Sequence, residues 1–379
     1  MSSVEEVVLH IPQEPVAGVV GVLVSILLAV LALPMVSKRV EENLEPFFLV
    51  MGIIAVAAIY AAGILPASGL ADLAKKALLT PVMLHGVPIG ITQVVLIAGL
   101  IFWRYHDPIY RGIGGLLQRL GLRGFLFVMI TLLGLTSGII SVIVAAVVFA
   151  EIMAAVPLPR ERKVEATVLA AFALGMGAAL TPVGEPLATI AVSKLSGPPY
   201  HAGFDFLLRL LGPYIVPAVV AVAAYTALRV SRGAGEEARE SMVGGVVYGE
   251  TLYTVIIRAV RVYIFVAALE LLGTSFTPLV KWYFTRIPPY ILYWVNMISA
   301  VVDNATLTAA EIGPFLTLSQ IKAALLGLIV SGGMLIPGNI PNIVAAGRLG
   351  ITSKEWARIG IPFGIALLAI FFLLLYTPL

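Results

Sequence analysis

The sequence predicts an all-α polytopic membrane protein, with two preceding spans and then two inverted repeats. Three observations predict this fold class. The 379 residues are 60% hydrophobic and only 12% charged, whereas soluble domains carry about 25% charged residues. Several apolar runs approach or exceed the roughly 18 residues that can span a bilayer. The same order of apolar runs, amphipathic arms and Gly/Pro-broken runs also occurs twice along the chain.

The N-terminal part of the chain contains plain spans and amphipathic segments. Two spans are expected at about 17–36 and 46–65, followed by an amphipathic segment at 70–79. A third span at about 87–103 leads into a basic arm at 103–124. We expect this arm to lie at the membrane interface, because it is amphipathic and too polar to cross.

Two further segments of this half are interrupted in mid-membrane. Residues 124–156 contain "GLTSGIIS", and residues 164–196 contain "GMGAALTPVGEP". Backbone groups freed by such clusters are tolerated in a membrane only where they face protein or a water-filled cavity. We therefore expect 124–156 to form a re-entrant hairpin and 164–196 a broken helix. A plain span at about 211–228 ends this half.

The pattern repeats after a Gly-rich charged linker. A span at about 250–272 and a short amphipathic arm at 275–289 precede a second hairpin around "MISAVVDNATLTAAEIGP". A second broken helix around "GGMLIPGNIPN" and a span at about 359–378 follow. The expected divisions are an N-terminal scaffold (1–87), repeat 1 (88–232), the linker (233–249) and repeat 2 (250–379).

The two halves also align residue by residue. Matching "TPVGEPLATIA" with "IPGNIPNIVAA" pairs Glu185 with Ile340, and matching "SGIIS" with "SAVVD" pairs Ser141 with Asp303. Each half therefore contributes one acid, at a different position. The alignment predicts an internal duplication.

The basic residues predict the orientation. With the N-terminus outside, most basic residues fall on the inner side, as the positive-inside rule requires. The loop 157–163 carries three basic residues and the loop 311–320 none. Each repeat then crosses three times, so the second is inverted relative to the first. We expect a multi-pass protein of the cell (inner or plasma) membrane with both termini outside.

Asp303 is the first candidate site residue. It is the only residue with a charged side chain between Arg286 and Glu311, and a carboxylate at mid-depth costs about 2.5–3.5 kcal/mol on insertion scales. Asn304 and Thr306 place neutral oxygens beside it, and such a hard-oxygen environment suits Na⁺ or a similar cation. The alternative is a protonated, structural Asp at a helix break.

Glu185 is the second candidate, in the break of the first half. Its alternative role is to cap the half-helix that follows, where the helix dipole favours a negative charge. We expect Asp303 and Glu185 to meet at the repeat interface and to bind a transported cation. The expected neutral ligands are Thr181, Ser137, Ser141, Asn339 and Asn342. The alternative role of the hydroxyl groups is to form hydrogen bonds with the backbone groups that the helix break leaves free.

Other charged residues in the apolar runs are assigned no site. Arg258 and Arg261 are expected to extend to the inner membrane surface, and Glu270 is expected to be a surface carboxylate near the outer end. An enzyme is not expected, because H-E-x-x-H is absent and no membrane histidine can serve as the base of a serine nucleophile. We expect no bound cofactor and no nucleic-acid partner; the partners are the lipid bilayer and the transported ions.

"ISAVVDNATLT" and the two broken segments together resemble the ion transporter superfamily over about 88–379. That superfamily includes D-type sodium/proton antiporters, arsenite permeases and citrate/dicarboxylate symporters. The hairpin with Asp303, Asn304 and Thr306 looks like the one that helps to bind sodium there, and "TPVGEP" suggests a short branch of predicted cation transporters. The resemblance implies a homodimer with a fixed scaffold and a moving unit. "SGIIS" stands where the sodium/carboxylate symporters carry an Asn-Thr motif, which counts against a symmetric two-sodium site.

The expected function is therefore secondary active cation transport, and first of all Na⁺/proton antiport. Two membrane carboxylates can hold either protons or a cation, and this competition would couple the two fluxes. The alternative is a sodium-coupled transporter of an anion, arsenite or a small carboxylate. Such a protein needs helix N-termini aimed at the anion, and Glu185 places a negative charge at one of those ends.

Overall fold

The computed structural model describes residues 7–41, 43–83, 90–233, 251–283, 288–301, 304–314 and 316–376, and every regular element among them is helical. Five helical stretches are long and apolar enough to cross a membrane: Ala17–Pro34, Leu44–Ala61, Arg111–Ile140, Phe206–Arg232 and Ser353–Tyr376. The chain is therefore a helical membrane protein, as the sequence predicts.

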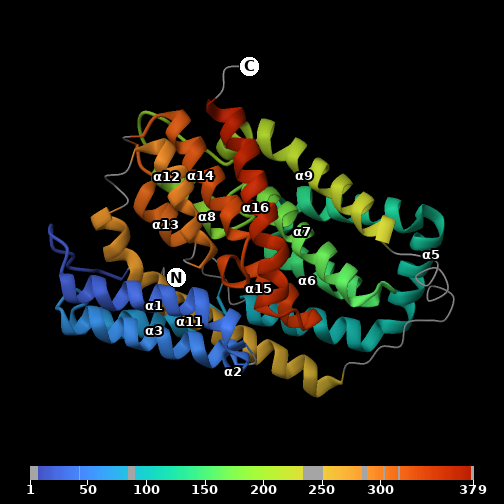
Figure 1. Ribbon diagram of the computed structural model, residues 1–379, viewed down its shortest axis with the longest axis horizontal. Helices are drawn as coiled ribbons and strands as arrows, with labels where there is room; N and C mark the ends of the chain where they lie inside the picture. Colours follow the sequence, from blue (N-terminus) through green and yellow to red (C-terminus); the bar gives the residue numbers. More distant parts are fainter. Residues whose placement is uncertain are drawn as a thin grey trace.

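Figure 1 shows how the helices are arranged in space. In chain order they are α1 (Ala17–Val36), α2 (Lys38–Glu41), α3 (Leu44–Ala61), α4 (Ala67–Leu79), α5 (Ile91–Ile140), α6 (Val142–Ala155), α7 (Arg160–Ala178), α8 (Pro186–Lys194), α9 (Phe206–Gly233), α11 (Leu252–Tyr283), α12 (Pro289–Val295), the 3₁₀ helix η2 (Asn296–Ala300), α13 (Asn304–Glu311), α14 (Leu318–Gly332), the 3₁₀ helix η3 (Ile336–Gly338), α15 (Ile340–Leu349) and α16 (Ser353–Tyr376).

Helices α1, α3 and α11 lie side by side along one edge of the molecule (Figure 1). Gly52 lets α3 approach α11 closely, because a Cβ there would lie 3.0 Å from the Cβ of Leu271. Phe48 of α3 stacks on Phe265 of α11 with their ring centroids 4.9 Å apart. These contacts join α11, which comes late in the chain, to the N-terminal spans.

The interior of the molecule is built from α6, α7 and α14, and every residue of α7 from Val164 to Ala178 is buried. A helix that is apolar on all sides belongs inside a bundle. Helices α5, α9, α14, α15 and α16 pack around α7. The interrupted segments therefore lie at the centre of the protein and the plain spans toward its edges.

Two amphipathic arms differ from expectation. The arm 103–124 is continuous with α5, which departs from helical geometry only at Tyr105 and at Gly121, where φ is +65°. Glycine adopts this left-handed conformation without a steric penalty. The arm 275–289 was also expected to be separate, but α11 continues through it as far as Tyr283.

Candidate functional site

Both predicted broken helices are interrupted, and the two interruptions are alike. Residues 179–185 separate α7 from α8, and residues 333–339 separate α14 from α15. The N–H groups of Gly184 and Gly338 each donate to the carbonyl group three residues earlier. A Cβ on either glycine would come too close to the carbonyl oxygen of the last residue of the preceding helix. The two breaks therefore share one backbone conformation that depends on a glycine at the same position.

This correspondence corrects the predicted alignment of the breaks by one residue, because Glu185 matches Asn339 and not Ile340. Glu185 has φ −154° and ψ 159°, Asn339 has φ −155° and ψ 150°, and each precedes the first residue of its half-helix. The Oδ1 of Asn339 accepts a hydrogen bond from the N–H of Ile340 at 2.9 Å. Glu185 makes no side-chain capping bond to α8, although its side chain is buried. Its position is that of a cap, but its carboxyl group does not perform the capping.

The segments before the two breaks also make matching contacts. Ser137 donates a hydrogen bond to the carbonyl of Leu174 in α7 at 2.9 Å. Ser299, its partner in the alignment, donates to the carbonyl of Leu328 in α14 at 3.0 Å. Leu174 and Leu328 occupy the same position relative to their breaks. The predicted alignment of 137–141 with 299–303 therefore agrees with the contacts of Ser137 and Ser299.

The first break gathers three of the predicted site residues. Ser141 separates α5 from α6 with φ +76°, and its Oγ accepts a hydrogen bond from the first turn of α6. Next to it, the N–H of Val142 donates to the carbonyl of Gly184 at 2.9 Å. The hydroxyl of Thr181 donates to the carbonyl of Gly138. Ser137, Ser141 and Thr181 thus hold the turn against the break, which is the alternative role expected of these hydroxyl groups.

The second break gathers three predicted asparagines around Gly332. A Cβ on Gly332 would lie 3.6 Å from the Nδ2 of Asn304 and 3.7 Å from the Cβ of Asn339. The Nδ2 of Asn342 donates to the carbonyl of Gly332 at 2.8 Å. Asn304 Nδ2, Asn342 Oδ1 and the Oγ of Ser331 are buried without a hydrogen-bond partner within the described part of the chain. Ser331 was not predicted, because a lone serine in an apolar helix carries no distinct sequence signal.

Asp303 lies outside the described residues, as does the side chain of Thr306. Helix α13, which begins directly after Asp303, packs against α8, which begins directly after Glu185. In the same way, α6 packs against α15. A Cβ on Gly175 of α7 would lie 3.2 Å from the Nδ2 of Asn339. The predicted residues that the structure describes therefore form two neighbouring groups, one at each break.

A buried ion-pair cluster was missed by the sequence analysis. Glu151 of α6 is 1% exposed. Its Oε1 lies 3.0 Å from the Nη2 of Arg258 in α11, and its Oε2 lies 2.9 Å from the Nε of Arg348 in α15. Arg258 is buried, so the expectation that it extends to the membrane surface is wrong. A single acid within the apolar run "VIVAAVVFAEIMAA" was the available signal.

A second missed carboxyl is Glu311, at the end of α13. It is 4% exposed, and its Oε2 accepts a hydrogen bond from the Nδ2 of Asn296 at 3.0 Å. Glu151 and Glu311 are therefore buried acids in addition to the two that were expected to form the site. Glu270 is half-buried and pairs with Lys76 of α4.

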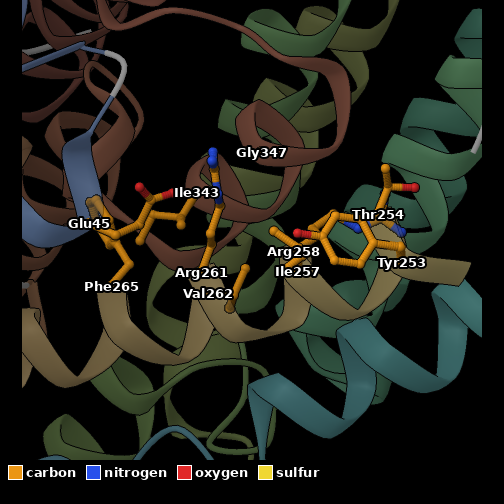
Figure 2. A pocket seen from close by; sticks show the side chains of 10 residues that line it. All are labelled: Glu45, Tyr253, Thr254, Ile257, Arg258, Arg261, Val262, Phe265, Ile343 and Gly347. Atoms are coloured by element: carbon orange, nitrogen blue, oxygen red, sulfur yellow. The ribbon is translucent and has the colours of Figure 1, made fainter. Parts of the chain in front are cut away.

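A pocket of about 310 Å³ lies between α11, α15 and the start of α3. Arg258 and Arg261 line it on α11, with Glu45 on α3 and Gly347 on α15. Figure 2 shows Arg261 extending from α11 toward Gly347. Because Arg258 also pairs with Glu151, the ion-pair cluster borders this pocket.

Comparison with known proteins gives a family. No curated protein sequence matches the chain. A family model described as "protein of unknown function" (DUF1646) matches residues 20–377. The match includes both helix breaks and covers nearly the whole chain. The chain is a member of the DUF1646 family.

Proposed function

We propose that the protein is a secondary active cation transporter, and most directly a Na⁺/proton antiporter. The observation that carries this proposal is the pair of buried oxygen atoms at the second break, Ser331 Oγ and Asn342 Oδ1, which lack hydrogen-bond partners among the described residues. Buried polar groups are nearly always hydrogen-bonded, so such a pair indicates an occupant. Serine and asparagine oxygens are hard ligands that suit Na⁺, and Asp303, the acid that we assign to the same site, directly precedes Asn304 in the sequence.

The coupling would come from the two candidate acids. Glu185 is buried at the start of α8, and α8 packs against α13, the helix that follows Asp303. This packing supports a site that both carboxyl groups share. When a cation is bound, the acids are ionised; when it leaves, they take up protons. Competition for the same oxygens then drives the two ions in opposite directions.

The proposed architecture is a pair of inverted repeats, 88–232 and 250–379, each with a re-entrant hairpin and a broken helix. The matching breaks support the duplication, and the packing of α6 on α15 and of α8 on α13 supports a site between the repeats. Such discontinuous helices at a repeat interface are typical of secondary transporters. The edge layer with α1 and α3 would be the scaffold of a homodimer in the cell membrane, with both termini outside.

The test is ion flux in proteoliposomes that contain the purified protein and a pH-sensitive dye. Na⁺, Li⁺, K⁺, Ca²⁺ and Mg²⁺ are added in turn, and proton movement is recorded. Asp303→Asn should abolish cation-driven proton flux without lowering the melting temperature. Asp205→Asn is the matched control, since Asp205 is exposed and pairs with Arg209 four residues further along the chain. Full transport by a folded Asp303→Asn protein would show that Asp303 does not bind the cation.

A second candidate function is sodium-coupled transport of a small anion. It is favoured by the pocket between α11 and α15, which two arginines line. Arginine guanidinium groups recognise carboxylates and similar oxyanions. The same proteoliposomes separate the two functions. Sodium-dependent uptake of arsenite or a dicarboxylate that is lost in Arg261→Gln would favour the anion, whereas cation-driven proton flux with no anion present favours the antiporter.

A further inference from the structure

The second hairpin segment contains a buried carboxyl group that the proposed cation site does not use. Glu311 lies at the far end of α13 from Asn304. Its Oε2 accepts a hydrogen bond from the Nδ2 of Asn296, and that Nδ2 also faces the carbonyl of Ala324 in α14 at 3.4 Å. The Oε1 of Glu311 and the Oδ1 of Asn296 are buried without a hydrogen-bond partner among the described residues. Two acceptor atoms of adjacent side chains are therefore left without a donor.

The missing donor is what a protonated carboxyl group supplies. A carboxylic acid and a primary amide can pair through two hydrogen bonds, one from the amide N–H and one from the acid O–H. The first of these is present between Asn296 and Glu311. The two atoms left over, Oε1 and Oδ1, are the pair that the second bond would join. Protonation at Oε1 therefore satisfies both atoms at once.

The surroundings disfavour the ionised form of Glu311. The two arginines that neutralise Glu151 have no counterpart here, since the hydrogen bond from Asn296 is the one polar contact that Glu311 makes with the described residues. An ionised carboxylate that is buried without a charged partner is expensive. The titratable groups on the elements packed against α13 are Lys194 of α8 and Glu185 directly before it, Tyr253, Arg258, Arg261, Tyr263, Glu270, Lys281 and Tyr283 of α11, and Lys322 of α14. None of these described groups forms an ion pair or a hydrogen bond with Glu311.

A metal cation fits this position less well than a proton. Hard cations such as Mg²⁺ and Ca²⁺ take about six or more oxygen ligands. Here the side chains offer two oxygens without partners, and the amide nitrogen of Asn296 already occupies one side of the carboxyl group. A proton needs a covalent bond to the Oε1 of Glu311 and one hydrogen-bond acceptor, the Oδ1 of Asn296.

We propose that Glu311 carries a further proton of the antiport cycle, in addition to the protons that compete with the cation at Asp303 and Glu185; this rests on the proposed antiport function. The eight residues of α13 place Glu311 about 10 Å along the helix from Asn304, at 1.5 Å per residue. Helix α13 would then hold the cation at its beginning and a further proton at its end.

The decisive variant is Glu311→Gln. Glutamine can donate to the Oδ1 of Asn296 as the protonated acid does, so the variant mimics the protonated state and should fold. The matched control is Glu270→Gln, which removes a carboxylate of α11 that pairs with Lys76. Three properties are measured in proteoliposomes: exchange of radiolabelled Na⁺ for Na⁺, the number of protons moved per Na⁺ when a Na⁺ gradient drives the flux, and the infrared band of protonated carboxyl groups.

We expect the Glu311→Gln variant to keep Na⁺/Na⁺ exchange and to move fewer protons per Na⁺ than the parent, because only the protons at Asp303 and Glu185 remain. We also expect it to lose one protonated-carboxyl band that the parent and the Glu270→Gln control both show at neutral pH. An unchanged number of protons per Na⁺ in Glu311→Gln would overturn the inference and leave antiport intact. An unchanged band would overturn it as well, because Glu311 would then be ionised. Absence of cation movement in the parent would refute the proposed function instead, and the band would still report whether Glu311 holds a proton.

Discussion

Replacing Glu151 by Gln should destabilise the protein strongly, because it removes the one negative charge in a buried cluster with two arginines. Arg258 and Arg348 contact its two carboxylate oxygens at 3.0 and 2.9 Å. Removing one partner of a buried ion pair costs about 3–5 kcal/mol. Unfolding entropies of about 2.1 cal/mol/K per residue give about 0.8 kcal/mol/K for a chain of this length, so a loss of about 4 kcal/mol lowers the Tm by about 5 °C.

The assay is thermal unfolding of the purified protein in detergent, followed by intrinsic tryptophan fluorescence. Asp205→Asn is the control, because its exposed ion pair with Arg209 is worth about 0–1 kcal/mol. Replacing all three members of the cluster by Met should restore most of the lost stability, since an apolar replacement leaves no buried charge without its partner. Equal, small shifts for Glu151→Gln and Asp205→Asn would refute this reasoning.

Three further predictions follow from the breaks and the proposed topology. Gly184→Ala should lower the free energy of unfolding by about 1–3 kcal/mol through overpacking, because the new Cβ would overlap the backbone of Ala178. In the control Gly112→Ala the new Cβ has nothing within 4 Å, so the Tm should be unchanged or higher. Similar losses of stability in both variants would contradict the close contact at Gly184. Glu185→Gln should change the pH dependence of cation-driven proton flux at an unchanged Tm, and a change in Tm alone would assign Glu185 a structural role. The chain has no cysteine, so single cysteines at Leu158 and Thr317 can be labelled in intact cells with an impermeant maleimide. Labelling at 317 but not at 158 is expected, and labelling at 158 would contradict the inverted topology.

The positions of the helix breaks could be predicted because glycine and proline in an apolar run leave few other options. Their register was predicted one residue out, because the alignment matched Pro186 with Pro341. Proline is tolerated at either of the first two positions of a helix, and the two half-helices use different ones. The correct register of the two breaks follows from Gly184 and Gly338, because at each of these positions the backbone of the preceding helix leaves no room for a Cβ.

The charged interior could not be predicted from single segments. Arg258 lies near one end of its helix, and a guanidinium there can usually reach the membrane surface. Its partner Glu151 is 107 positions away in the sequence, so only the fold brings them together. Asn296 and Glu311 are also brought together by the fold, because Asn296 lies in η2 and Glu311 at the end of α13. Local sequence indicated that a buried acid needs a partner, but not which residue that partner is.

The ion-pair cluster also constrains how this family can evolve. Glu151, Arg258 and Arg348 come from three helices that are far apart along the chain, yet the loss of the acid alone leaves two buried arginines without the carboxylate that both contact. Relatives should therefore change these three positions together, or keep all three. We expect positions 151, 258 and 348 to covary across the DUF1646 sequences. An aligned relative with an apolar residue at 151 and both arginines intact would show that the cluster is dispensable.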